Sequence, residues 1–281
     1  MAVYRLKQKL GFSMTNSDPI LNIDGKVATI TLSRPGAANR LNKSDLRVLR
    51  RHVATVNAES RIMVLRIQAA GKYFCAGYDL FSIEDDDGTG PDDFGDVMDQ
   101  IEMARPVTIA AVNGGVYGGG TDLCLACDFR VGVPQAHMQM TALKLGIHLY
   151  KGGLERYVSR LGIDTAKRLL LTAEKIDAAA MLKLGVLTEL VAPENLQERV
   201  HDLSETLRGL APEVLFSVKK HLNGIAKAQL DTKSLEADIH HSRHCPNARE
   251  GLLAWKEKRL PVYSPPSNFS KGSSELDKRS I

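Results

Sequence analysis

The sequence predicts an α/β fold in which helices connect strands that lie side by side in a sheet. Three short runs rich in apolar and β-branched residues occupy 27–33, 63–68 and 106–113, and glycine or proline lies close to their ends. The order strand, glycine-rich turn, helix, strand recurs over 106–133, and from Leu161 onward the apolar spacing is helical. Strands that alternate with helices in this way indicate crossover connections.

The first run, VATITLS, alternates β-branched and small residues, which is typical of a strand. Pro35 and Gly36 end it. We expect the next helix to begin at Asn42 or Ser44, because both side chains can accept a hydrogen bond from the first turn. Its predicted buried face consists of four apolar residues at helical spacing: Leu46, Leu49, Val53 and Val56.

The second run, MVLRIQ, leads into a turn with the sequence FCAGYDL at 74–80. The next segment, SIEDDDGTGPDDFGD at 82–96, is acidic and rich in glycine and has no periodicity. We expect a solvated surface loop, although its place beside the turn also fits a lid over a pocket. The run from Pro106 predicts a buried strand, the segment TDLCLAC after a glycine triplet predicts a helix, and FRVGV predicts another strand.

Beyond Leu161 the predicted elements are helical, and they lie at 164–174, 177–185, 194–210, 211–225 and 235–259. We therefore divide the chain into an α/β core at 14–195 and a C-terminal helical region at 196–263. Residues 1–13 are expected to be an extension or a mis-assigned start, because Met14 can also begin the chain. Residues 264–281 are rich in serine, proline and charge, which predicts a disordered tail.

The composition is that of a globular protein, with 43% hydrophobic and 25% charged residues in 281. No apolar run approaches the roughly 18 residues of a membrane span, and no secretory signal is visible. Four cysteines are too few for a disulfide framework, which favours the cytoplasm. The formal net charge of +4 comes from the two ends, so residues 14–263 are neutral and indicate neither a nucleic-acid nor a membrane partner.

Two turns share one pattern, FCAGYDL at 74–80 and YGGGTDL at 117–123. Each follows an apolar strand and opens toward a helix, where backbone N–H groups are unpaired and the local charge is positive. Glycine lets another group approach that backbone closely. Two such turns can aim two N–H groups at one oxygen and form an oxyanion hole. The alternative is a pair of tight junctions with glycine for packing.

Several motifs in one order resemble the crotonase superfamily, also called the enoyl-CoA hydratase/isomerase family. The resemblance runs from about Ile20 to Tyr263. Its motifs are ITLSRPGAANRLN, FCAGYDL, PVTIAAVNGGVYGGGTDL, LLLTAEKIDAAAMLKLGVLTELV and EGLLAWKEKRLP. The resemblance implies a spiral of ββα units with a C-terminal helical trimerisation region, and trimers that sometimes pair into hexamers.

The resemblance also implies an oxyanion hole formed by the N–H groups of Tyr78 and Gly119. These would hold the thioester carbonyl of an acyl-CoA, which gains enolate character. Coenzyme A is then part of the substrate, and no separate cofactor or metal is implied. The residues that match substrate-binding or CoA-binding positions are Ala38, Asn39, Arg40, Ala76, Tyr78, Asp79, Leu80, Tyr117, Gly118, Gly119, Ala142, His148, Tyr150 and Lys258, the last reaching a neighbouring subunit.

The acid and base positions depart from the family pattern. Hydratases of the family use two glutamates, and the matching residues here are Asp122 and Ala142. Alanine cannot transfer a proton, which argues against efficient hydration. Asp122 is the leading acid/base candidate, or else a structural carboxylate satisfied by backbone N–H groups. Tyr78, His148 and Tyr150 are the substitute candidates, and Asp79 is expected to be structural.

Three other signals have simpler explanations. Cys124 and Cys127 form a C-x-x-C, but no second pair supports a zinc site, so we expect buried packing. The HHSRHC segment at 240–245 resembles a metal site, although the family needs no metal. A basic helix at 43–51 resembles one that binds RNA in a branch of the superfamily, but the neutral body makes a nucleic-acid partner the weaker interpretation.

The sequence thus predicts an enzyme that processes an acyl-CoA thioester, a lyase or isomerase of the enoyl-CoA hydratase/isomerase type. The reaction stays open among isomerisation, hydration or its reverse, decarboxylation and thioester hydrolysis. The alternative is a CoA-thioester or RNA-binding protein of the same fold with weak or no hydratase activity.

Overall fold

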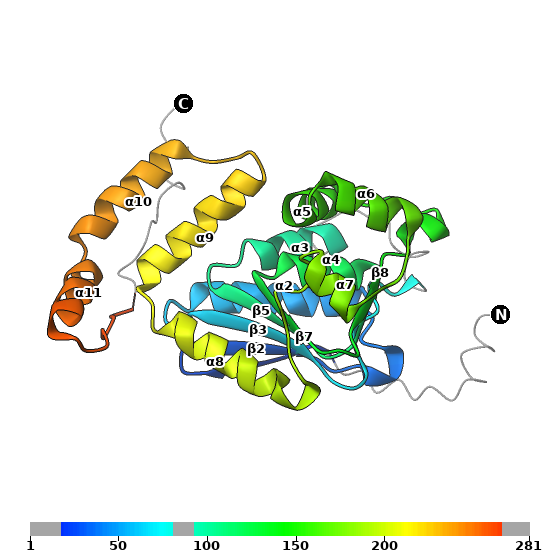
Figure 1. Cartoon of the computed structure of the whole chain (residues 1–281), viewed down its shortest axis with the longest axis horizontal. Helices are drawn as coiled ribbons and strands as arrows, with labels where there is room; N and C mark the ends of the chain where they lie inside the picture. Colours follow the sequence, from blue (N-terminus) through cyan, green and yellow to red (C-terminus); the bar gives the residue numbers. More distant parts are fainter. Residues whose placement is uncertain (1–17, 81–92, 266–281) are drawn as a thin grey trace, which may run out of the picture.

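The computed structural model describes residues 18–80 and 93–265, which form an α/β body and three projecting C-terminal helices (Figure 1). The expected extension at 1–13, most of the tail at 264–281 and most of the loop at 82–96 lie outside these residues. No helix in the described ranges combines the length and the apolar character that crossing a membrane requires.

The main sheet has six strands in the order β1-β2-β3-β5-β7-β10. The strands are β1 (Ile20–Asp24), β2 (Val27–Leu32), β3 (Val64–Ala69), β5 (Val107–Val112), β7 (Phe129–Gly132) and β10 (Glu189–Leu190). β1 pairs antiparallel with β2 through a tight turn, and the remaining neighbours are parallel. The strands predicted at 27–33, 63–68 and 106–113 are confirmed, and the α/β class with crossover connections is confirmed with them.

A second sheet of four short strands places the two glycine-rich turns. Its order is β4 (Tyr73–Cys75), β6 (Gly115–Tyr117), β8 (His137–Gln139) and β9 (Ile176–Asp177). β4 and β6 are parallel neighbours, so their carboxyl ends meet at the same edge. The turn at 74–80 follows β4 and the turn at 117–123 follows β6, which brings the two turns together.

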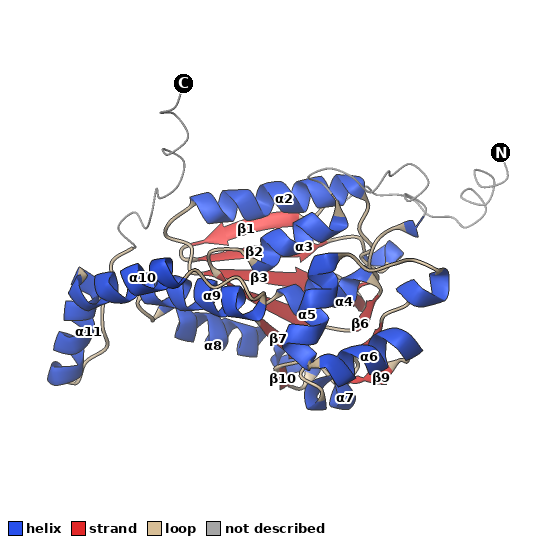
Figure 2. Ribbon diagram, turned by 90° about the horizontal axis from the view of Figure 1, so that it is seen from above, coloured by secondary structure: helices blue, strands red, loops and turns tan. Residues whose placement is uncertain are grey.

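Helices cover both faces of the main sheet and create two apolar cores. On one face lie α2 (Lys43–Ala58), α3 (Phe94–Glu102), α4 (Gly119–Ala126), α5 (Lys151–Leu161), α6 (Ile163–Thr172) and α7 (Ala178–Lys183), and on the other lies α8 (Leu196–Arg208) (Figure 2). Alternate residues of β5 divide between the cores, since Ala110 and Val112 join the first and Ile109 and Ala111 the second.

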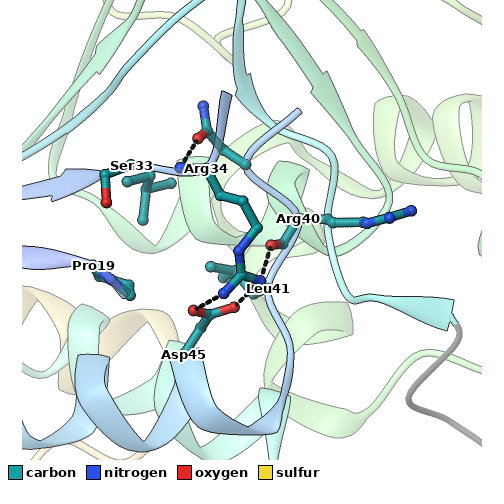
Figure 3. A pocket seen from close by; sticks show the side chains of 8 residues that line it. Pro19, Ser33, Arg34, Arg40, Leu41 and Asp45 are labelled. Atoms are coloured by element: carbon teal, nitrogen blue, oxygen red, sulfur yellow. Dashed lines mark hydrogen bonds and ion pairs between the residues drawn. The ribbon is translucent and has the colours of Figure 1, made fainter. Parts of the chain in front are cut away.

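The start of α2 settles which residue caps it. The Asn42 side chain accepts a hydrogen bond from the Asp45 N–H at 3.0 Å, and the Asp45 carboxylate accepts one from the Asn42 N–H. Arg34 clamps the same carboxylate at 2.7 and 2.8 Å (Figure 3). This reciprocal arrangement makes Asn42 the cap rather than Ser44. The predicted buried face of the helix is confirmed at Leu46, Leu49, Val53 and Val56.

Two element predictions are wrong at their boundaries. The single helix expected at 235–259 is two, α10 (Thr232–His244) and α11 (Pro246–Glu257), because Pro246 cannot continue the preceding helix. The loop expected at 82–96 ends early, since α3 begins at Phe94 and Asp93 caps it.

The helices α9 (Pro212–Ala226), α10 and α11 form what we call the C-terminal arm, which projects beyond α8 in Figure 1. Polar residues of α9 and its C-cap attach the arm to the body. Lys219 Nζ donates to the Pro106 carbonyl at 2.8 Å, and Asn223 donates to the Glu102 carbonyl at 2.9 Å. The helical region predicted at 196–263 therefore includes α8, which belongs to the packed body, and the arm, which is anchored by polar contacts.

Candidate active site

The two glycine-rich turns are in direct contact. A Cβ added to Gly77 would lie 2.6 Å from the Gly119 nitrogen and 2.8 Å from the Tyr117 carbonyl oxygen, so only glycine fits at position 77. Its φ of +84° also lies in the region that disfavours side chains. Helix α4 begins at Gly119, whose N–H is one of those that a helix leaves unbonded internally.

The segment expected to hold the CoA arm lies beside the first turn. The Ala76 N–H donates to the Ala38 carbonyl at 2.9 Å, and Leu41 bonds to Gly77 and Asp79 at 2.8 and 2.7 Å. Because Leu41 bonds to both neighbours of Tyr78, the Tyr78 N–H points away from Leu41.

Asn39 supports this segment although its backbone φ is +54°. Its buried side chain accepts from the Arg34 N–H and donates to the Ala70 and Tyr73 carbonyls at 2.8 Å. Arg40 lies 3.5 Å from Asp79, and its side chain points away from the Arg34–Asp45 pair in Figure 3. The structure thus gathers Ala38, Asn39, Arg40, Ala76 and Asp79, all predicted from the sequence, around the turn that carries Tyr78.

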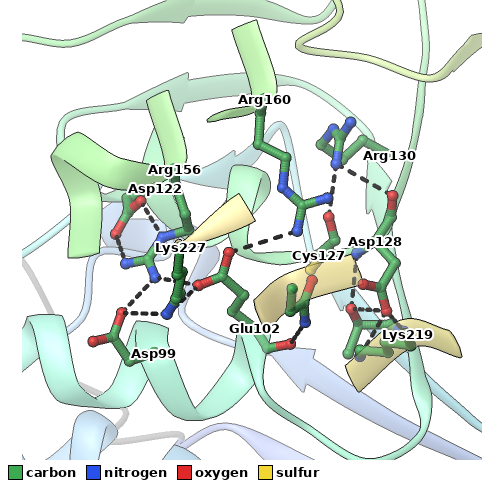
Figure 4. A network of polar contacts seen from close by, with 12 residues as sticks. Asp99, Glu102, Asp122, Cys127, Asp128, Arg130, Arg156, Arg160, Lys219 and Lys227 are labelled. Atoms are coloured by element: carbon green, nitrogen blue, oxygen red, sulfur yellow. Dashed lines mark hydrogen bonds and ion pairs between the residues drawn. The ribbon is translucent and has the colours of Figure 1, made fainter. Parts of the chain in front are cut away.

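Both oxygens of the buried Asp122 carboxylate are occupied by side chains. Arg156 donates to Oδ1 through Nε and to Oδ2 through a terminal nitrogen, both at 2.7 Å (Figure 4). The Tyr150 hydroxyl donates to Oδ2. The structural alternative expected backbone N–H partners for this carboxylate, whereas the structure gives side-chain partners to both of its oxygens.

Arg156 belongs to a wider cluster that we call the charge cluster. Its carboxylates are Asp99, Glu102 and Asp122, and its cations are Arg156, Arg160 and Lys227. Arg156 is fully buried and lies 3.0 Å from Glu102. Burial opposes its charge, but the hydrogen bonds and charges of Asp122, Asp99 and Glu102 together outweigh burial and raise the pKa of Arg156.

Tyr150 is a neutral proton donor in this arrangement. Burial raises the pKa of the Tyr150 phenol far above its usual value, and the negative charge of Asp122 raises it further. Its ring lies 6.2 Å from that of Phe94 and would contact a Cβ at Gly95. Phe94 in turn packs edge-on against Tyr78 and would contact a Cβ at Gly119. Phe94 thus links the two glycine-rich turns to Tyr150.

Ala142, the second position at which hydratases of the family carry a glutamate, has no titratable group. It begins a short 3-10 helix, Ala142–Leu145, and packs against the core together with Tyr78 and Tyr150. The preceding Thr141 hydroxyl would lie 3.6 Å from a Cβ at Gly118. A glutamate at position 142 would therefore start beside the second turn.

Four other predicted residues have no hydrogen bond, ion pair or ring contact with Asp122 or Tyr150 in the described part of the chain, and their roles stay predictions. His148 is exposed, with a ring nitrogen 2.6 Å from the Leu149 carbonyl, and Leu80 is also exposed. The Tyr117 hydroxyl lies 2.5 Å from His137, so only the Tyr117 backbone faces the turns. Lys258 caps α11, far along the arm from α4 and α5 in Figure 1.

The metal look-alikes contain no metal-binding cluster. Within residues 18–80 and 93–265, no three His, Cys, Asp or Glu side chains are placed to hold an ion. Cys124 and Cys127 are buried free thiols, and burial raises the pKa of Cys124 to about 12, so it stays protonated. The rings of His240 and His244 stack 4.8 Å apart.

Sequence reasoning missed Arg156, Glu102 and Phe94. Arg156 lies in KGGLERYVSRL, where a charged residue at helical spacing has the appearance of a solvated surface position. One signal was present, because Arg156 occupies the buried stripe of α5 with Gly152, Gly153 and Tyr157. A charged residue on an otherwise apolar or small-residue stripe indicates a buried ion pair.

The comparisons with known proteins show the family of this chain. A family profile described as Enoyl-CoA hydratase/isomerase matches residues 22–266. The chain belongs to the enoyl-CoA hydratase/isomerase family. It is 29% identical to the short-chain-enoyl-CoA hydratase of Clostridium acetobutylicum, covering 88% of this chain and 97% of that protein. It is 31% identical to the crotonyl-CoA hydratase of Syntrophomonas wolfei, with coverage of 88% and 97%.

A solved relative supports the same fold. The crystal structure of an enoyl-CoA hydratase from Bacillus anthracis superposes with a TM-score of 0.80 at 29% identity, covering 89% of this chain and all of that one. The crotonase-like architecture predicted from the motifs is confirmed.

Proposed function

We propose that the enzyme binds an acyl-CoA thioester and stabilises its enolate with the N–H groups of Tyr78 and Gly119. The observation that carries this proposal is the contact between the two turns, in which Gly77 lies against the Gly119 nitrogen. Two N–H donors that converge on a carbonyl oxygen stabilise the negative charge that develops there. The names of the relatives in Clostridium and Syntrophomonas support a CoA thioester as substrate.

Tyr150 and Asp122 act in this proposal as a single proton relay. The phenol oxygen accepts a proton from a substrate carbon while its own proton passes to Asp122 Oδ2, and the reverse transfer delivers a proton to another carbon. The phenol stays neutral throughout, in keeping with its raised pKa. Arg156 holds the carboxylate in position at 2.7 Å from both oxygens.

A single relay suits the migration of a double bond in an enoyl-CoA. Isomerisation moves one proton from one carbon to another through the enolate, so one proton-carrying pair is sufficient. Hydration also requires a group that activates water, and Ala142 supplies none. We therefore infer that isomerisation is favoured over hydration.

The oxyanion hole is tested by replacing Gly119 with proline, which removes the N–H. We expect kcat to fall by about 10²–10³ relative to Gly119→Ala, which keeps the N–H. The alanine variant is the matched control because any side chain at 119 displaces Phe94. Isomerisation of 3-hexenoyl-CoA, followed at the enoyl-thioester absorbance, measures both. Equal rates in two folded variants would contradict the oxyanion hole.

The relay is tested by Tyr150→Phe, which removes the hydroxyl and keeps the ring. We expect kcat for 3-hexenoyl-CoA isomerisation to fall by about 10²–10⁴ with little change in KM, because proton transfer is lost and binding is not. The control is Tyr157→Phe on α5, the helix that Tyr150 precedes; Tyr157 is a buried tyrosine whose hydroxyl contacts Thr121 at 2.7 Å. Retained activity in Tyr150→Phe would remove the phenol from the mechanism.

The missing hydratase carboxylate is tested by Ala142→Glu. We expect slow hydration of crotonyl-CoA by the wild type and a gain of about tenfold in the variant, less than a positioned general base gives, because the surroundings were not built to hold the new side chain. Ala142→Gln is the matched control, since it has the same length without the carboxylate. A wild type that already hydrates crotonyl-CoA rapidly would refute the argument from Ala142.

We also propose that the chain assembles into trimers or hexamers through the arm. Large apolar side chains are exposed there, among them Val218, Leu222, Ile225 and Trp255. A soluble protein rarely leaves such a set uncovered. Sedimentation at micromolar concentration should give a trimer or hexamer, and a stable monomer would count against this assembly.

A further inference from the structure

We infer that Lys227, at the end of α9, is a positioning residue for the Asp122–Tyr150 pair, so that the arm takes part in the chemistry of the body. The inference rests on the role proposed above for that pair. Lys227 is outside every motif of the active site, and nothing in its sequence surroundings, GIAKAQL, indicates a functional residue.

An unbroken series of contacts joins Lys227 to the phenol. Its Nζ lies 2.8 Å from Glu102 Oε2, and the same oxygen accepts from Arg156 at 3.0 Å. Other nitrogens of the Arg156 guanidinium bind both oxygens of Asp122, and Asp122 binds Tyr150. Figure 4 shows the Lys227 nitrogen between Glu102 and Asp99, next to the Arg156 guanidinium.

The charge balance of the cluster depends on Lys227. Arg156, Glu102 and Asp122 are almost completely buried, with exposures of 0%, 3% and 1%, so water screens their charges poorly. Lys227 binds Glu102 closely, whereas Arg160 lies 3.7 Å from it.

Without Lys227, three carboxylates would share two cations. Asp99 and Glu102 would then draw the Arg156 guanidinium toward α3, since both already bind one of its terminal nitrogens. Asp122 would lose part of its clamp, and the phenol would lose its fixed partner. A small displacement at reacting groups is costly for rate even when its origin is distant.

A second lysine of α9 separates docking from positioning. Lys219, Asn223 and Lys227 follow one another at four-residue spacing and share a face. Lys219 binds the Pro106 carbonyl and lies 2.6 Å from Asp128, neither of which is part of the charge cluster. Lys219 therefore anchors the arm without contacting the series of residues that leads to Tyr150.

The experiment compares Lys227→Met, Lys227→Arg and Lys219→Met in the full-length protein, by 3-hexenoyl-CoA isomerisation and thermal unfolding. We expect Lys227→Met to lower kcat about tenfold with KM nearly unchanged, and Lys227→Arg to recover most of it. Lys219→Met should lower Tm at least as much while kcat stays within about twofold of wild type. Equal losses of kcat in both methionine variants, or none in Lys227→Met, would overturn the inference.

A readout without substrate distinguishes failure of this inference from failure of the proposed function. In protein labelled with 3-fluorotyrosine, Tyr150→Phe identifies the Tyr150 fluorine resonance. We expect this resonance to shift in Lys227→Met and to stay in place in Lys219→Met. If wild type isomerises no enoyl-CoA but the resonance shifts, the proposed function fails and the positioning stands. An unmoved resonance in Lys227→Met refutes the positioning.

Discussion

The bidentate contact between Arg156 and Asp122 is the interaction on which the site depends. A buried guanidinium needs several acceptors, and it obtains them from α3 and α4 at once. Removing one partner of a buried ion pair lowers the stability of the fold by about 3–5 kcal/mol, because the remaining charge is then neither paired nor hydrated. The geometry is therefore held firmly enough to keep a phenol and a carboxylate in one arrangement.

The backbone around the two turns is constrained sterically rather than electrostatically. Gly120 shows the same limit as Gly77, since a Cβ there would lie 2.3 Å from the Cys75 carbonyl oxygen. Parallel pairing of β4 and β6 brings the turns to one edge, and small residues let them touch. The short second sheet thus supplies the position of the turns, and the charge cluster supplies the position of the Asp122–Tyr150 pair that we propose as a proton relay.

The sequence predicted those parts of the fold in which a residue type has one main physical role, as β-branched residues have in strands and glycine has in tight turns. Alternating β-branched runs predicted β2, β3 and β5, and glycine before a helix predicted the contact region of Gly77 and Gly119. The sequence could not show that Asp122 is held by Arg156, because the two meet only through the packing of α4 on α5. The stripe that Arg156 shares with Gly152, Gly153 and Tyr157 indicates that the arginine is buried, but it does not identify the carboxylate that the arginine binds.

The short strands of the second sheet were not predicted, because their formation also depends on contacts between distant parts of the chain. The second sheet consists of strands of two or three residues, too short for a periodic pattern, and its pairing is decided by neighbours distant in the chain. Position 142 was different. Once the resemblance identifies it as the place of the second glutamate, the sequence itself shows that the carboxylate is missing there. The preceding residue, Thr141, lies beside Gly118.

The attachment of the arm has a consequence for the order of folding. Asn223 reaches Glu102 across 121 residues and Lys219 reaches Pro106 across 113. Contacts this distant form late, and a chain emerging from the ribosome completes its N-terminal part first. A nascent body therefore contains Asp99, Glu102, Asp122 and Arg156 before Lys227 has been synthesised. On this account the charge cluster is completed only after the body has been synthesised, and products truncated before Lys227 would have the fold of the body without the complete cluster.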